Sequence, residues 1–199
     1  STRINVLGST HILELARQRG ISRLSYASSI AAQAMNDNEW LAPLYGAHKV
    51  CTEQMAAVYW QDWGIPSVGI RPAIIYGPGR DQGMSSAPTI AMLAASVGKA
   101  YEIPFSGAIS YVHVEDAAMR FVGAAAKSYE AAHVFDLDGT PADIEEVISL
   151  IKSHQSDANI SYTGEAMPFP ADADNGKLNQ LLNISGCRPM AQGVLDTMA

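Results

Sequence analysis

The chain has little cysteine and no cysteine arrangement that builds a structural site. Its two cysteines, Cys51 and Cys187, lie far apart, and neither has a Cys or His neighbour at the spacing of a zinc site. Disulfides and cysteine-rich frameworks belong mainly to oxidising compartments, so this composition predicts a cytoplasmic protein with reduced thiols. We expect no metal site and no disulfide framework; a single Cys51–Cys187 bridge stays open as an alternative.

Basic residues and long apolar runs are also scarce. Lys and Arg number 13 against 20 Asp and Glu, which gives a formal net charge of −7, and no run of basic residues occurs. A general nucleic-acid-binding surface needs an excess of basic residues, so this class is excluded. No apolar run reaches the roughly 18 residues of a membrane span, and no signal-peptide pattern opens the chain. We therefore expect neither a nucleic-acid partner nor a membrane partner.

The chain does contain enough apolar sequence for a substantial core. Hydrophobic residues make up 48% of its 199 residues and charged residues 17%, which is the balance of a globular protein. Disordered and fibrous classes are excluded by the same numbers. A length of 199 residues fits one domain, or one domain with an appendage.

Apolar strands alternate with helices along most of the chain. Helices are expected over residues 4–19, 44–63, 88–97, 115–127 and 141–154, with weaker helical segments at 177–182 and 193–198. Strands are expected over residues 21–27, 67–76, 101–104, 111–114, 133–137 and 160–162. The first helix places one set of residues on a single face: Ile4, Leu7, His11, Ile12, Leu15 and Ala16. Because helices separate the strands, crossover connections are needed, and an α/β fold with a mostly parallel sheet and flanking helices follows.

Tyr45 and Lys49 are the most informative pair in the sequence. They lie four residues apart on an expected helix, so their side chains share one face. A phenol has a pKa near 10 in water, and a neighbouring ammonium can lower that pKa by about three units, or about 4 kcal/mol. Such a pair predicts proton transfer at a hydroxyl or carbonyl group while a hydride moves elsewhere. The alternative is an ordinary Tyr–Lys contact on a solvated helix face.

Two serines follow an expected strand that ends at Ala27. Reactive groups collect at the carboxyl ends of parallel strands, and Ser28 and Ser29 occupy such an end. A serine hydroxyl can hydrogen-bond the same substrate oxygen as a phenol. Ser29 is the first candidate for this role and Ser28 the second.

The order of these motifs along the chain resembles one family. The motifs are Asn5-Val6-Leu7-Gly8-Ser9, Tyr26-Ala27-Ser28-Ser29, Tyr45-Gly46-Ala47-His48-Lys49 with Glu53, Arg71-Pro72, Tyr76-Gly77-Pro78-Gly79-Arg80 and Tyr111-Val112-His113-Val114-Glu115-Asp116. Together they resemble the extended short-chain dehydrogenases/reductases, which are the NAD-dependent epimerase/dehydratase family. With Arg71-Pro72 and the Tyr76–Arg80 motif taken as one, these are five ordered matches, which are far more specific than any one motif.

The resemblance implies a role for each matched residue. Tyr45 would be the general acid/base, Lys49 would lower its pKa and bind the nicotinamide ribose, and Ser29 would hold the reacting oxygen. Cofactor contacts, besides those of Tyr45 and Lys49, are implied for Asn5, Ser28, Pro72 and Ala73. Substrate contacts, besides that of Ser29, are implied for Ile74 and Arg80. For His113 a packed structural role is expected.

The resemblance also implies a fold that is only partly present. The family opens with a strand, a Gly-x-x-Gly-x-x-Gly turn and a helix that hold the cofactor pyrophosphate, and nothing in this chain fits that pattern. Roughly 60 to 90 residues of nucleotide-binding sheet would then be absent. Residues 1–100 would form the C-terminal half of a Rossmann-like domain that carries the Ser/Tyr/Lys site. Residues 101–199 would supply the remaining sheet elements and a small substrate lobe, as one compact unit.

This departure bears on cofactor and partners. We expect a fragment that binds NAD or NADP weakly or not at all when alone, because the adenosine half has no cradle. NAD and NADP cannot be told apart, since the residue that reads the ribose 2′ position lies in the absent part. An uncovered strand edge and exposed helices predict a homodimer or other self-association.

Two further departures concern the substrate. Relatives that act on nucleotide sugars place an Arg-Asp where this chain has Ile109 and Ser110, and a charged diphosphate contact is thereby lost. Arg80 is the alternative phosphate contact. After the double serine the family often has Val-Tyr-Gly, where this chain has Ala32-Gln33-Ala34, so the pocket wall differs. A small-molecule substrate that is sugar-like or a hydroxy acid is expected.

Two functions from different classes follow. The first is an NAD(P)-dependent epimerase, dehydratase or dehydrogenase activity at a secondary alcohol or keto group, inactive in this isolated chain. The second is a catalytically silent relative that serves as a folded interaction module.

Overall fold

The computed structural model describes residues 2–35, 44–167, 169, 171 and 176–199. Residues 36–43, which precede the helix expected over 44–63, lie outside the described residues. Internal contacts divide the chain into two compact units. The first comprises Ser1–Pro72, Ala118–Leu137 and Asn175–Ile184, and the second comprises Ala73–Ala117, Asp138–Asp174 and Ser185–Ala199. The units therefore do not follow a single cut near residue 100, because the chain leaves the first unit after Pro72 and returns to it at Ala118.

The first unit is built on a three-stranded parallel sheet. Its strands β1 (Ser25–Ala27), β2 (Ser67–Pro72) and β6 (Ala132–Leu137) lie in the order β1-β2-β6. Tyr26 pairs with Gly69 and Arg71 pairs with Asp136 across the sheet. The expectation of a parallel sheet with helical crossovers is confirmed for this unit. The expected strand over 21–27 is shorter, because pairing with β2 begins only at Ser25.

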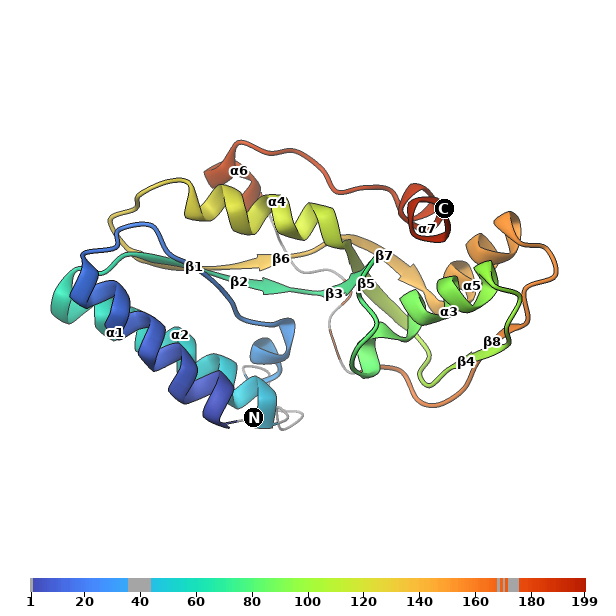
Figure 1. Cartoon of the computed structure of the whole chain (residues 1–199), viewed down its shortest axis with the longest axis horizontal. Coiled ribbons are helices and arrows are strands. Elements are labelled where there is room, and N and C mark those ends of the chain that lie inside the picture. The colour runs from blue at the N-terminus through green and yellow to red at the C-terminus, as the bar shows by residue number, and fades with distance from the viewer. Residues whose placement is uncertain (1, 36–43, 168, 170, 172–175) are drawn as a thin grey trace. The chain divides into compact units, whose positions relative to one another are not determined.

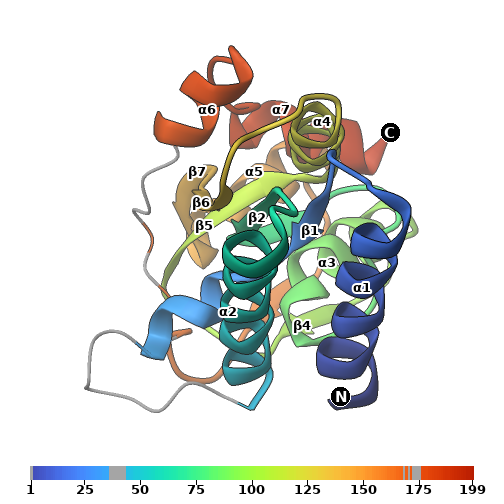
Figure 2. The ribbon, with the colours of Figure 1, turned by 90° about the vertical axis from the view of Figure 1, so that its left-hand side faces the viewer.

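Helices cover both faces of this sheet. Figure 1 and Figure 2 show α1 (Ser9–Arg19) and α2 (Leu44–Trp63) on one face, with α4 (Val114–Ala125) and α6 (Gly176–Leu182) on the other. A π-helical segment, η1 (Arg3–Gly8), leads into α1. Both α1 and α2 end at a glycine, Gly20 and Gly64, whose positive φ angles of 61° and 65° suit a helix C-terminus. None of the helices among the described residues has the length and hydropathy of a membrane span.

The apolar face expected on the first helix is mostly uncovered. Leu13 and Ala16 are buried. The exposed large apolar side chains of this segment are Ile4, Leu7, Ile12 and Leu15. The periodicity identified the helix correctly, but of the expected face only Ala16 is buried, and Leu13 lies outside that expected set.

The second unit holds two further sheets. Strands β3 (Ile74–Tyr76), β5 (Ala108–His113) and β7 (Thr140–Asp143) form one, and β4 (Tyr101–Ile103) and β8 (Ile160–Tyr162) form the other. All neighbouring strands are parallel except β5 and β7.

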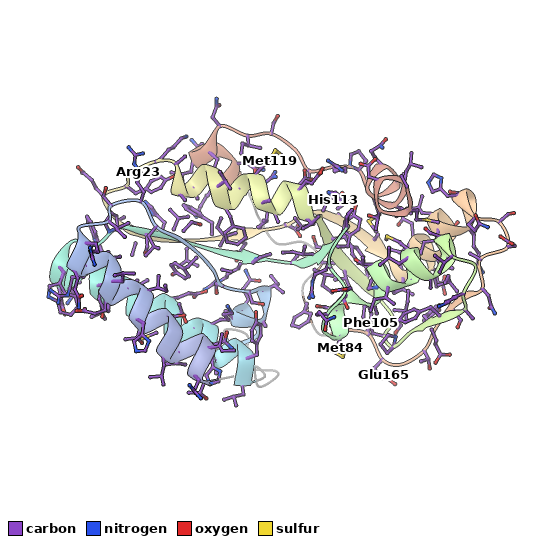
Figure 3. The ribbon with its side chains drawn as sticks, viewed as in Figure 1. Arg23, Met84, Phe105, His113, Met119 and Glu165 are labelled. Atoms are coloured by element: carbon purple, nitrogen blue, oxygen red, sulfur yellow. The ribbon has the colours of Figure 1, made fainter. Side chains whose placement is uncertain are left out.

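Three helices, α3 (Ala87–Ser96), α5 (Ile144–His154) and α7 (Met190–Met198), pack with these strands around one hydrophobic core. Figure 3 marks Phe105 and His113, both of which are buried. Burial and the Arg188 cation lower the pKa of His113, so its imidazole favours the neutral form. The buried position agrees with the packed role expected for His113.

In two further elements the difference from the sequence expectation involves a proline. The single strand expected over 67–76 is two strands in different sheets, because Pro72 offers no backbone N–H with which to continue the ladder. The helix expected over 141–154 begins only at Ile144. The preceding residues form edge strand β7, where Pro141 is tolerated, and the Asp143 carboxylate caps the helix by accepting from the Glu145 N–H at 3.0 Å.

Candidate active site

The candidate site lies at the carboxyl end of β1, in the first unit. The Ser28 N–H donates to the Ile70 carbonyl at 2.7 Å, which extends the pairing with β2 by one residue. Ser29 then starts a 3₁₀ turn, η2 (Ile30–Met35), and its Oγ accepts the Ala31 N–H at 3.2 Å. A hydroxyl that accepts this bond can still donate its own proton to a ligand. The two serines thus differ, since only Ser29 sits in the turn beyond the strand.

Lys49 connects helix α2 to this strand end. Its Nζ donates to the Ala27 carbonyl at 2.7 Å and lies 5.4 Å from the centroid of the Tyr45 ring. Burial lowers the pKa of Lys49 from its ordinary value. Tyr45 itself is 42% exposed. The Tyr–Lys pair is therefore no contact on a fully solvated helix face: its lysine is anchored to the residue before the double serine.

Asn5 lies in the π-helical segment η1, a distortion that is frequent at functional sites. Its backbone carbonyl accepts from Ser9 Oγ at 2.8 Å and from Thr52 Oγ1 at 3.0 Å. Since Thr52 is on α2, one turn after His48, this carbonyl joins the start of the first helix to the helix that carries Lys49. Asn5 is thus near the site, within the same unit.

A cavity of about 580 Å³ opens beside these residues. Its polar lining includes Asn5, Lys49 and Thr52, and its apolar lining comes from the first helix and from Leu24 on the approach to β1. Tyr26 of β1 also lines it, and burial raises the pKa of this phenol. The cavity is large enough for part of a small organic ligand.

The donors at this site suit a nicotinamide ribose. An ammonium has three N–H groups, one of which is bonded to the Ala27 carbonyl, and Lys49 borders the cavity. The exposed Tyr45 hydroxyl adds a donor and acceptor. Tyr45 and Lys49 would therefore hold the ribose hydroxyls of such a cofactor. The pyrophosphate has no matching glycine-rich turn in the sequence.

Glu53 and Arg71 are two residues to which sequence reasoning gave no role beyond marking the resemblance. Arg71 donates from Nε and Nη2 to the two carboxylate oxygens of Glu53, at 2.8 and 2.6 Å. Glu53 also accepts from Ser28 Oγ. The sequence does contain a signal for Glu53: this residue lies eight positions after Tyr45, two helical turns further along a similar side of the same helix.

The remaining predicted residues divide between the units. Pro72 ends β2 and is buried, and Ala73 starts the second unit. Ile74 is buried in the core of the second unit, paired with Tyr111. Arg80 donates to the Gln82 carbonyl and to Ser85 Oγ, so two of its N–H groups are bonded within its own loop. The first unit thus brings together the serines, Asn5, Tyr45 and Lys49, and the implied contacts of Ile74 and Arg80 stay predictions.

Ile109 and Ser110, the two positions where the loss of a diphosphate contact was expected, are buried in the second unit. Ile109 is buried in its hydrophobic core. The Ser110 hydroxyl is buried and accepts the Gly139 N–H at 2.8 Å. Neither side chain could take up a phosphate. Within the described part of the chain, no group of three or more His, Cys, Asp or Glu residues could hold a metal ion.

Comparison with known proteins places these features in a family. The sequence model of the NAD dependent epimerase/dehydratase family matches residues 1–137, which is more than half of the chain. A curated relative, the uncharacterized UDP-glucose epimerase YtcB of Bacillus subtilis (strain 168), is 24% identical over 208 residues. The match covers 98% of this chain and 65% of the relative, so the chain spans just under two thirds of that protein's length.

Solved structures share the fold. A GalE-like L-threonine dehydrogenase from Cupriavidus necator superposes with a TM-score of 0.84 at 18% identity, over 98% of this chain and 70% of its own. The UDP-glucose 4-epimerase of Thermus thermophilus, in complex with NAD, gives a TM-score of 0.79 at 20% identity, over 99% and 69% of the two chains. The expected partial Rossmann-like fold is thereby confirmed.

Proposed function

The chain belongs to the NAD-dependent epimerase/dehydratase family, and on that premise we propose that it carries the proton-transfer site of an NAD(P)-linked reaction at a secondary alcohol or ketone. The observation that carries the proposal is the position of Lys49. Its ammonium is bonded to the Ala27 carbonyl beside the double serine and lies 5.4 Å from the Tyr45 ring centroid. One cation thus lies close to the Tyr45 ring and is bonded to the strand end.

Each side chain then has a distinct task. The Tyr45 hydroxyl takes the proton from the substrate alcohol, or returns it to the ketone. Ser29 donates a hydrogen bond to the reacting oxygen and so holds it near the phenol. Lys49 stabilises the negative charge that develops while the proton is in transit. The cofactor, when bound, supplies the hydride acceptor.

The substrate is proposed to be a small hydroxy acid or a compact sugar. Relatives of this chain are named both for UDP-glucose epimerisation and for L-threonine dehydrogenation, so the family match does not choose between them. The two positions where a diphosphate contact was considered are Ile109 and Ser110, and both are buried. Arg80 is engaged by its own loop. A substrate without a nucleotide diphosphate therefore fits these residues better.

A specific observation favours a second candidate, a silent interaction module. Among the described residues, the first helical segment leaves the apolar side chains of Ile4, Leu7, Ile12 and Leu15 exposed. Such a surface favours self-association, and a homodimer is proposed on this ground. The catalytic groups would then be retained without turnover.

Assays with two substrates test these alternatives. The isolated chain is expected to be inactive at low NAD, because its cofactor binding is weak. Millimolar NAD offsets weak binding by mass action, and slow NADH formation from L-threonine or a related hydroxy acid is then expected. The chain is expected not to convert UDP-glucose to UDP-galactose, because it has no diphosphate contact at residues 109 and 110. Conversion of UDP-glucose would contradict the substrate proposal. Absence of turnover with every hydroxy acid and sugar would favour the silent module.

A further inference from the structure

We infer that Glu53 and Arg71 form a positioning clamp, which fixes helix α2 against the end of β1 and thereby sets where Lys49 and Ser29 lie. The inference deepens the proposed function and rests on it only for the catalytic meaning of that position. The clamp itself is a feature of the first unit. Neither residue is proposed to touch the substrate or the cofactor.

The contact between the two residues has the geometry of a fixed pair. Both carboxylate oxygens of Glu53 accept a separate N–H of the Arg71 guanidinium, at 2.8 and 2.6 Å. This two-point arrangement sets the angle between the groups as well as their distance, which a lysine at the same place could not do. The bond to Glu53 is the main cause of a raised pKa at Arg71. Helix α2 is therefore held to the middle strand, β2, in one orientation.

The clamp also reaches the strand that ends at the site. Ser28 is 3% exposed and Glu53 6% exposed, and the Ser28 hydroxyl donates to the Glu53 carboxylate. One turn earlier on the same helix face, Lys49 donates to the carbonyl of Ala27. Two successive turns of α2 thus bind two successive residues of the strand end. The residue that follows is Ser29.

The chain of polar contacts continues across the sheet. Arg71 lies 3.6 Å from Asp136, its register partner on β6. The Glu53 carboxylate on α2 therefore links the ends of β1 and β2, and Arg71 extends the link to β6. Burial raises the pKa of Asp136, and Arg71 opposes that rise.

A purely stabilising role would not require this arrangement. Removing two charges from water costs free energy that their attraction often fails to recover, and apolar residues frequently replace such pairs without loss of stability. A buried carboxylate that receives three N–H or O–H donors is instead well suited to hold one geometry. Because Glu53 lies one helical turn from Lys49, holding Glu53 in one geometry also fixes the position of Lys49.

Hydrogen exchange and ligand binding test the clamp with three variants. Glu53→Gln is isosteric but loses the charge, and Ser28→Ala removes only the hydroxyl that the clamp holds. Glu14→Gln is the matched control, because Glu14 pairs with Arg17 on the exposed side of α1. Exchange at the Ala31 and Ala32 amides, which bond to Ser29, reports the turn beyond β1.

In Glu53→Gln and Ser28→Ala these two amides are expected to exchange about tenfold faster, because a looser turn opens more often. Reduced nicotinamide mononucleotide should bind about tenfold more weakly to Glu53→Gln, and Glu14→Gln should match the native chain in both measurements. Unchanged exchange at both amides in both variants would overturn the clamp, whatever the activity. If the native chain turns over no substrate and both variants still exchange faster at these amides, the clamp is supported and the proposed function is refuted. If Glu53→Gln does not fold, Ser28→Ala alone decides.

Discussion

Tyr45→Phe is expected to lower turnover of the hydroxy-acid substrate by about a thousandfold, which lies within the range of a lost general acid/base. The substitution removes one oxygen atom and leaves the ring that lies 5.4 Å from the Lys49 ammonium. Because Tyr45 is 42% exposed and sits in the first turn of α2, its hydroxyl has little part in the core. The thermal midpoint should therefore stay unchanged while NADH formation falls.

Tyr162→Phe is the control for this substitution. Tyr162 is a similarly exposed tyrosine in the second unit, where its hydroxyl donates to Glu145 at 2.6 Å. Its loss should leave turnover within about twofold, since surface substitutions of this kind have small effects. Near-native turnover by Tyr45→Phe would remove the phenol from the mechanism.

Gly139→Ala is expected to destabilise the second unit by about 3 kcal/mol or more, which is at the upper end for steric overpacking. A β-carbon at residue 139 would lie 1.9 Å from the carbonyl oxygen of Tyr111 and 2.5 Å from its carbon. These are backbone atoms of β5, and Tyr111 is paired there with Thr140 of β7. The clash cannot be relieved by a side-chain rotation. Denaturant unfolding should show an early transition, or the variant should fail to fold.

Gly123→Ala supplies a control of opposite sign. Gly123 lies within helix α4, and the nearest atom to an added β-carbon is 3.8 Å away, on Leu182. Alanine should stabilise this helix by about 0.5–1 kcal/mol, because glycine is the poorer helix former. Equal unfolding midpoints for Gly139→Ala and the native chain would show that the close approach of residue 139 to β5 is not as described.

Local sequence patterns predicted most of the helices and strands. The helices expected to end at residues 19 and 63 do end there, and each is followed by a glycine, Gly20 or Gly64, with a positive φ that this residue adopts readily. The alternation of helices and strands likewise led to a parallel sheet. The misplaced start of α5 shows the limit of such signals: Pro141 is compatible with a helix start, and only pairing with β5, about 30 residues earlier, makes it part of a strand.

The site residues likewise fall into those that a local pattern predicts and those that depend on distant contacts. The spacing of Tyr45 and Lys49 on one helix is visible in the sequence, and the Lys49 ammonium lies 5.4 Å from the centroid of the Tyr45 ring. Their catalytic roles stay predictions. The role of Glu53 was not found, because it depends on which strand residue faces α2. Arg71 is 18 residues further along, and nothing local shows that it approaches the helix. The family resemblance, now confirmed, marked both residues without giving the reason for their presence.

Binding of two nicotinamide ligands tests the proposed site most directly. Lys49, held at the end of β1, is proposed to bind the nicotinamide ribose beside Tyr45. NADH and reduced nicotinamide mononucleotide should then bind the native chain weakly and within about tenfold of each other, since the adenosine half finds no glycine-rich turn. Lys49→Met should weaken both by about tenfold or more, and Lys99→Met, an exposed lysine of the second unit, should weaken neither. Unchanged binding of both ligands by Lys49→Met would contradict the account.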